Sequence, residues 1–125
     1  NAGFSTGQPW LAVNPNYQRI NVQEALANPD SIFYTYQKLV QIRKENSWLI
    51  RADFELLDTA DKVFAYIRKD GDRRFLVVAN LSNEKQDLAV EGKVKSVLIE
   101  NTVAQEVFEK QILAPWDAFC VELTD

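Results

Sequence analysis

The acidic side chains are the first residues to consider for chemistry, because two carboxyl groups about 5 Å apart can cleave a glycosidic bond, one as nucleophile and one as acid. Asp58 and Asp61 flank an expected tight turn, whereas Glu84, Asp87 and Glu91 flank expected short strands. Carboxylates at such positions are usually solvated, and a catalytic pair needs a pocket that perturbs its pKa values. We therefore expect no catalytic residue within these 125 residues.

The isolated aromatic residues are a second group that could do chemistry, because flat rings can stack on sugar faces. Trp10, Tyr17, Trp48 and Trp116 are candidates for this role. Isolated aromatic side chains, such as Trp10 and Trp116 beside proline, more often cover the edge of a core or a seam between domains. We favour that structural role, and sugar binding through Trp48 or Trp116 remains an alternative.

Residue counts exclude most metal and nucleophile chemistry. The chain has no His and one Cys, Cys120, which lies in the apolar run AFCVEL and is expected to be a buried free thiol. The run DGD at 70–72 resembles part of a calcium loop, but the other ligands of an EF-hand are missing. We expect no metal and no cofactor.

Composition and charge restrict the partners. With 46% hydrophobic residues, 125 residues can bury one core. The net charge of −4 argues against nucleic acid and against an anionic membrane surface. No apolar run is long enough for a membrane span, and the N-terminus lacks the features of a signal peptide. A single cysteine fits a cytoplasmic protein. A chain that begins at Asn1 without Met is a fragment, a processed protein or an incomplete one.

One amphipathic helix is expected to organise the N-terminal part. Asn28 can cap its start, Pro29 suits the first helical position, and Asn46 can adopt the left-handed conformation that ends a helix. Its apolar stripe is Ile32, Phe33, Tyr36, Leu39 and Val40. Before it, residues 1–16 form a loop with Gly and Pro, and Asn21 with Glu24 predicts a capping box for a short helix through Ala27.

After Asn46 the pattern predicts antiparallel strands separated by turns. Asp70-Gly71 indicates a type I′ hairpin, and Gly92 a second hairpin between 86–90 and 94–100. The apolar run at 74–81 predicts a central strand. The expected strands are 54–57, 63–68, 74–81, 86–90, 94–100, 105–108 and 118–123. The fold class is therefore mainly β, a Greek-key-like antiparallel β-sandwich of about seven strands preceded by a loop and a helix.

Several short runs carry a family resemblance. They are NAGFS, PW, VNPNY and a helix that ends in RKEN, in this order within residues 1–57. In these runs the chain resembles the C-terminal part of bacterial α-glucosidases of the α-amylase superfamily, of the oligo-1,6-glucosidase and dextran glucosidase type. The later runs VFAYIR and FLVVANLS resemble, more loosely, the family's C-terminal β-sandwich.

The resemblance implies a domain layout and a site outside the chain. Residues 1–50 would be the loop and final helix of a truncated (β/α)8 barrel, and residues 51–125 a C-terminal β-sandwich domain that braces it. The family's catalytic carboxylates would lie upstream of Asn1, which leaves no catalytic residue here. Asn1 and Phe4 would be substrate-proximal at the pocket rim.

The resemblance also implies a parent activity. The parent would be a retaining hydrolase that binds gluco-oligosaccharides through the missing barrel and releases glucose from α-1,6 or α-1,4 linkages. Trehalose-6-phosphate hydrolases and sucrose isomerases are related alternatives. A glucan-binding sandwich module and an independent structural domain are alternatives of other classes.

Separation from a barrel would expose the apolar stripe of the helix. Each large side chain contributes about 1.5–3 kcal/mol when fully buried. We therefore expect the isolated chain to self-associate through Ile32, Phe33, Tyr36 and Leu39, or to pack this helix on its own sandwich.

Overall fold

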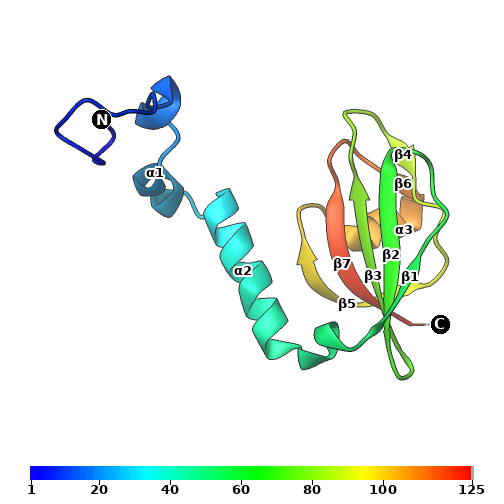
Figure 1. The fold of residues 1–125 in the computed structure, drawn as a ribbon. Coiled ribbons are helices and arrows are strands. Elements are labelled where there is room, and N and C mark those ends of the chain that lie inside the picture. The colour runs from blue at the N-terminus through cyan, green and yellow to red at the C-terminus, as the bar shows by residue number, and fades with distance from the viewer. Residues whose placement is uncertain (125) are drawn as a thin grey trace. The chain divides into compact units, whose positions relative to one another are not determined.

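The computed structural model describes residues 1–124, which form two compact units, Asn1–Gln41 and a second unit that begins at Ile42. Figure 1 shows their elements. Strands outnumber helices in the second unit, which confirms the mainly β antiparallel fold class.

The first unit holds a loop and short helices. η1 spans Pro15–Gln18 and α1 spans Val22–Ala27. Asn21 caps α1 as expected, because its side-chain oxygen accepts a hydrogen bond from the Glu24 N–H at 2.9 Å. α2 spans Ile32–Glu45 and continues into the second unit.

The predicted start of this long helix at Asn28 is wrong. Asn28 has extended backbone angles at the end of α1, because a residue before proline disfavours helical ones. Its side-chain oxygen accepts from the Asp30 N–H at 3.0 Å, which makes a turn in place of a helical start. Helical hydrogen bonding begins where the Ser31 carbonyl accepts from Tyr34 and Thr35.

The predicted left-handed stop at Asn46 is also wrong. Asn46 has φ −117° and ψ 77°, and it precedes a second 3-10 helix, η2, at Ser47–Ile50. Its side chain ends the helix by other means: it donates to the Ile42 carbonyl at 2.8 Å and accepts from the indole N–H of Trp48 at 2.9 Å. The helix therefore ends through side-chain hydrogen bonds.

The second unit is built on a five-stranded antiparallel sheet of order β1-β2-β3-β7-β5. Most of the apolar run at 74–81 lies in β3, Arg73–Asn80, at the centre of this sheet, which confirms the expected central strand. A separate two-stranded sheet pairs β4 with β6. The bounds are β1 Asp53–Leu56, β2 Val63–Asp70, β3 Arg73–Asn80, β4 Gln86–Asp87, β5 Lys93–Glu100, β6 Ile112–Leu113 and β7 Ala118–Thr124.

The expected strand at 105–108 is a helix, α3, at Ala104–Lys110. The carboxylate of Glu100 accepts from the Ala104 N–H at 2.9 Å and so satisfies one N–H at the start of the helix. The buried residues Ala104, Val107 and Phe108 recur at helical spacing. The expected strand covered four residues, of which only Val107 and Phe108 are apolar, and so short a segment cannot distinguish a helix from a strand by periodicity.

The hairpin expected around Gly92 does not form, because β4 pairs with β6 and β5 pairs with β7. The hairpin between β2 and β3 is confirmed, but the predicted type I′ turn at Asp70-Gly71 is wrong, because Asp70 pairs with Arg73 and the loop residues are Gly71 and Asp72. Of these two loop residues only Gly71 has positive φ, at 60°, as a type II′ turn requires.

The core lies between the inner face of the five-stranded sheet and a layer made of α3 and the two-stranded sheet. Figure 1 shows α3 behind the sheet. The second layer of the predicted sandwich is therefore partly helical. The buried core residues are Val63, Ala65, Ile67, Leu76, Val78, Leu88, Ala104, Val107, Phe108, Leu113, Phe119, Val121 and Leu123.

Candidate functional site

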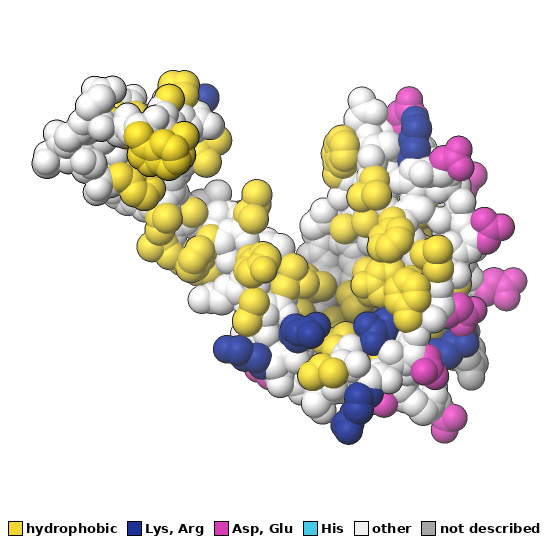
Figure 2. Space-filling model, viewed as in Figure 1, with side chains coloured by type: hydrophobic (Ala, Val, Ile, Leu, Met, Phe, Trp, Pro, Cys, Tyr) yellow, Lys and Arg dark blue, Asp and Glu magenta, His cyan; other side chains and the backbone are white. Residues whose placement is uncertain are grey.

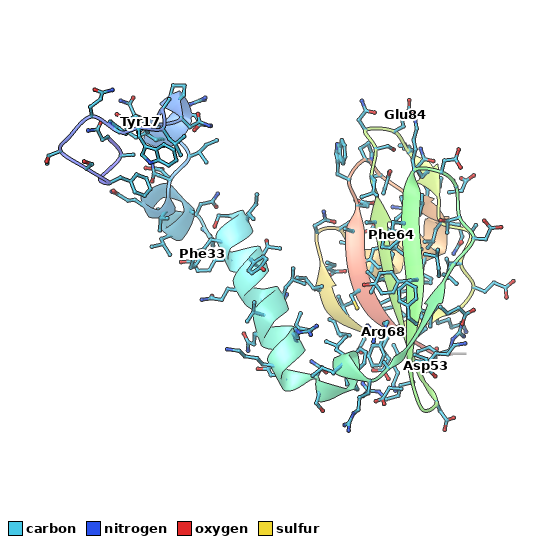
Figure 3. All side chains as sticks on the ribbon, viewed as in Figure 1. Tyr17, Phe33, Asp53, Phe64, Arg68 and Glu84 are labelled. Carbon is cyan, nitrogen blue, oxygen red and sulfur yellow. The ribbon has the colours of Figure 1, made fainter. Side chains whose placement is uncertain are left out.

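The N-terminal loop surrounds an open hollow of about 690 Å³ within the first unit. Aromatic side chains line much of it, including Phe4, Trp10 and Tyr17, of which Figure 3 labels Tyr17. Phe4 is 88% exposed. An open, mostly apolar hollow with aromatic walls suits a sugar ring or the apolar side chains of another protein segment.

The two residues expected near substrate occupy different positions in this loop. The Asn1 side-chain amide donates to the carbonyls of Ser5 and Gly7 at 2.9 and 2.8 Å, so its donors are used within the loop. Phe4 lines the hollow itself. Asn1 therefore holds the loop closed, whereas Phe4 is available for contact; substrate proximity stays a prediction for both.

The acidic candidates are all exposed, as solvated carboxylates should be. Glu84 pairs with Lys62 at 2.5 Å, and this lysine lowers the pKa of the carboxyl. Asp58 and Glu91 lie around a shallow hollow of about 200 Å³ that Arg74 also lines. Within residues 1–124, no group of three or more His, Cys, Asp or Glu side chains could hold a metal ion.

Glu122, a carboxylate that the sequence did not single out, has a strongly lowered pKa. Glu122 is buried in β7 and accepts hydrogen bonds from the Arg73 guanidinium at 3.1 and 3.2 Å and from Lys95 at 2.9 Å. The bonds from Arg73 and then Lys95 lower the pKa of Glu122 to about 2. A glutamate flanked by Val121 and Leu123 in an apolar strand was the available signal. Arg73 binds both carboxylate oxygens of Glu122 and Lys95 binds one of them, so we assign the cluster a structural role.

One face of the five-stranded sheet lacks a covering layer within the second unit. We call it the outer face and define it by Phe54, Leu56, Phe64, Tyr66, Val77 and Cys120. Phe64 is 45% exposed, and its ring centroid lies 5.5 Å from that of Tyr66, which lies 5.0 Å from Phe54. Figure 2 shows hydrophobic side chains gathered over this part of the sheet. Such a patch marks an interaction surface.

The connection between α2 and the sheet is fastened to this same side of the sheet. Arg68 of β2 donates to the carbonyls of Leu49 and Ala52 at 2.9 and 2.7 Å and to that of Asp53 at 3.2 Å. Figure 3 labels Arg68 and Asp53 near the lower end of the sheet. Trp48 of η2 stacks on Phe75 of β3 with ring centroids 3.8 Å apart. Residues 48–53 are therefore held against the sheet.

The two tryptophans proposed as sugar-binding alternatives differ in exposure. Trp48 is 8% exposed and its ring is covered by Phe75, so it cannot present a free platform. Trp116 is 59% exposed with φ 64°, and its backbone is bonded to Ser82 and Asn101. Within residues 1–124 no second ring contacts Trp116, so it lacks the coplanar partner expected of a glucan-binding surface.

Cys120 is a free thiol whose burial raises its pKa to about 11. The expected free thiol is confirmed, but Cys120 has intermediate exposure and is not fully buried; its low reactivity stays a prediction. Among the described residues, no helix is both long enough and apolar enough to cross a membrane.

Two family models match consecutive parts of the chain. The alpha-amylase catalytic domain matches residues 1–52, and the C-terminal domain of maltogenic amylase matches residues 54–119. The matches meet at the start of β1, directly after the segment that Arg68 and Trp48 hold on the sheet.

Curated relatives and a solved structure agree with these matches. The chain is 93% identical over 123 residues to glucan 1,6-alpha-glucosidase of Streptococcus pneumoniae, covering 98% of the chain and 23% of that protein. It is 37% identical to oligo-1,6-glucosidase of Bacillus cereus, again covering 98% and 23%. The crystal structure of trehalose-6-phosphate hydrolase of Bacillus licheniformis superposes with a TM-score of 0.83 at 34% identity, covering 100% of this chain and 24% of that one. The chain thus spans about a quarter of the length of these relatives.

Proposed function

The chain belongs to the α-amylase family of glycoside hydrolases, and from this premise we propose that it is the C-terminal portion of a retaining α-glucosidase that releases glucose from α-1,6-linked gluco-oligosaccharides. The observation that carries the proposal is the 93% identity to a glucan 1,6-alpha-glucosidase over almost the whole chain. The related oligo-1,6-glucosidase supports the same linkage.

The role of this chain in the reaction is to support the catalytic domain. Retaining hydrolysis requires a nucleophilic carboxylate and an acid about 5 Å apart in a pocket. The acidic residues at the turns and strand ends are exposed, and Glu122 is held by cations, so none of them suits either role. The catalytic pair then belongs to the part of the catalytic domain outside residues 1–124.

A domain layout and a location accompany the proposal. Residues 1–50 belong with the catalytic barrel and residues 51–125 form the C-terminal domain; the family matches at 1–52 and 54–119 support this division. The exposed ring of Phe4 and its place in the hollow support substrate proximity. A single cysteine that remains a free thiol supports a cytoplasmic location.

Related activities are less well supported. The similarity to trehalose-6-phosphate hydrolase is much lower than the similarity to the glucan 1,6-alpha-glucosidase. An α-1,4-glucosidase or a sucrose isomerase would have a similar C-terminal domain, joined to a catalytic domain whose pocket differs. A glucan-binding module is disfavoured because Trp48 is covered and Trp116 stands alone.

The test compares the chain with the full-length protein that carries it. Glucose release from isomaltose, maltose and trehalose-6-phosphate is measured for both, and intact mass verifies each polypeptide. We expect the full-length protein to prefer isomaltose and the chain alone to release no glucose. Turnover by the verified chain alone would overturn the supporting role, and preference for another substrate would overturn the assigned linkage.

A further inference from the structure

We propose that Arg68 makes the last part of the catalytic-domain sequence, residues 42–52, fold and unfold together with the C-terminal sheet. The final turn of α2 and the η2 segment that follows it are then stable only while that sheet is folded. The inference rests on the proposed function and deepens it, because it names the residue through which the C-terminal domain supports the end of the catalytic domain.

Residues 42–52 belong to one domain by sequence and to the other by contact. The catalytic-domain match covers residues 1–52, whereas the compact unit that contains the sheet begins at Ile42. The segment consists of the end of α2 and the short helix η2. Helical segments of this length are marginal in water by themselves. Contacts with the sheet therefore have to supply the stability of this segment.

Arg68 supplies polar contacts from β2. Its Nη2 donates to the carbonyls of Leu49 and Ala52 at 2.9 and 2.7 Å, and its Nε donates to the carbonyl of Asp53 at 3.2 Å. Figure 3 labels Arg68 and Asp53. The last carbonyls of a helix have no partner within it, so a cationic donor from outside the helix acts as a cap. Because Arg68 is paired in the sheet on both sides, this cap depends on the folded sheet.

Trp48 extends the anchoring back to α2. Its ring stacks on Phe75 of β3, and its indole N–H donates to the side-chain oxygen of Asn46 at 2.9 Å. The amide of Asn46 in turn donates to the carbonyl of Ile42 in α2 at 2.8 Å. The segment is therefore held at two points, by an aromatic stack on β3 and by the guanidinium of Arg68 on β2.

The three hydrogen bonds of Arg68 need the shape of a guanidinium. Its Nε and Nη2 lie in one rigid plane and donate to different carbonyls. A lysine carries all its donors on one atom, and a glutamine amide has one nitrogen and no charge, so neither reproduces this set. Lys69 is the matched control, because it is the next residue of β2 and pairs with the Glu55 side chain, outside residues 42–52.

Native-state hydrogen exchange of the 125-residue chain tests the inference. The reporter is the Ala52 N–H, which donates to the Trp48 carbonyl at 2.8 Å, and the reference is the Asn80 N–H of β3, which donates to Asp117 at 2.8 Å. We expect the protection factors of the two amides to agree within about tenfold and to fall equally with added urea, as for amides that exchange through one shared unfolding. Exchange of Ala52 that does not depend on urea would reveal local opening and overturn the inference.

Substitutions show whether Arg68 is the cause. Arg68→Gln and Arg68→Lys should each lower the protection of Ala52 relative to Asn80 at least about tenfold, because charge-assisted hydrogen bonds are lost. Lys69→Gln should leave this ratio unchanged. A general loss of stability lowers the protection of both amides, so it does not imitate the expected change in their ratio.

The other outcomes count against the proposal. An unchanged ratio in Arg68→Gln would show that the segment follows the sheet without Arg68. A ratio restored by Arg68→Lys would assign the effect to charge alone, and an equal fall in Lys69→Gln would assign it to any cation of β2. Exchange requires no turnover, so failure of this inference is distinguished from failure of the proposed activity.

Discussion

The indole of Trp48 stacks on the ring of Phe75 with centroids 3.8 Å apart and planes inclined by 15°. The contact joins the segment that follows α2 to the central strand of the sheet, and the guanidinium carbon of Arg73 lies over the ring of Phe75, 4.6 Å from its centroid. Trp48 therefore fixes where the chain enters the sheet domain. Replacement of Trp48 should therefore lower the free energy of unfolding, even though this residue lies outside every strand.

We expect Trp48→Ala to lower the free energy of unfolding of the second unit by about 3–5 kcal/mol, the usual cost of removing a buried large aromatic side chain. Trp116→Ala is the control, because that indole is mostly exposed and its loss should change stability by no more than about 0.5 kcal/mol. Urea denaturation followed by circular dichroism measures both. Equal losses would show that the stack on Phe75 contributes little.

The Glu122 cluster predicts acid sensitivity. The folded-state pKa of Glu122 is lowered from 4.5 to about 2 by hydrogen bonds from Arg73 and Lys95. A depressed carboxyl pKa contributes stability that is fully present above the unfolded value and is lost as pH falls towards the folded value. Unfolding free energy should therefore decrease between about pH 4.5 and pH 2. Glu122→Gln should flatten this decrease, whereas Glu106→Gln, which removes an exposed pair with Lys110, should leave most of it.

Cys120 should be unreactive in the folded protein, because its thiol pKa is raised to about 11 by burial and the thiolate is the nucleophile. At pH 8, reaction with a disulfide reagent should be slow in buffer and fast in denaturant. A native rate equal to the denatured rate would show that the outer face opens around this strand. The full-length protein should react no faster than the isolated chain.

The apolar stripe of α2 predicts self-association of the isolated chain. Ile32, Phe33, Tyr36 and Leu39 are all exposed within residues 1–124. Burial of each in a dimer would contribute about 1.5–3 kcal/mol. Sedimentation velocity should show a dimer that Phe33→Asp dissociates and that Gln37→Asp, on the polar side of the helix, does not. A monomer for the unsubstituted chain at high concentration would contradict this prediction.

Phe4 predicts a kinetic effect in the full-length enzyme. If its exposed ring contacts substrate, Phe4→Ala should raise KM for isomaltose about three- to tenfold, the usual value of an aromatic contact. Val22→Ala, an exposed position in α1 outside the hollow, is the control. Unchanged KM and kcat would remove Phe4 from the pocket rim. Asn1→Ala should act through the loop and lower stability, since its amide binds Ser5 and Gly7.

Local structure is predictable wherever one short segment decides its own conformation. Asn21 and Glu24 predicted the start of α1, and Gly71 supplied the positive φ of the β2–β3 hairpin. The nearly uninterrupted apolar run of β3 predicted a central strand, and β3 pairs with β2 on one edge and with β7 on the other. The exposed acidic turns were also predicted from their positions.

Features that depend on contacts between residues far apart in the sequence are not predictable in the same way. The segment of α3 was predicted to be a strand. It is a helix because a helix places Val107 and Phe108 together against the core, and the sequence alone does not show that contact. β5 pairs with β7, which is distant in the chain, and not with the segment across Gly92. The ion-pair partners of Glu122 could not be predicted from its neighbours in the sequence, since Arg73 and Lys95 reach it only through the sheet.

The sequence by itself determined the family, the mainly β class and the absence of histidine chemistry, because short motifs and residue counts do not depend on distant contacts. Only the tertiary structure decided that Trp48 is covered, that no second ring contacts Trp116 within residues 1–124, and that Phe54, Leu56 and Phe64 lie exposed on one side of the sheet. Exposure depends on what the fold brings against a side chain, and residues far apart in the sequence supply those neighbours.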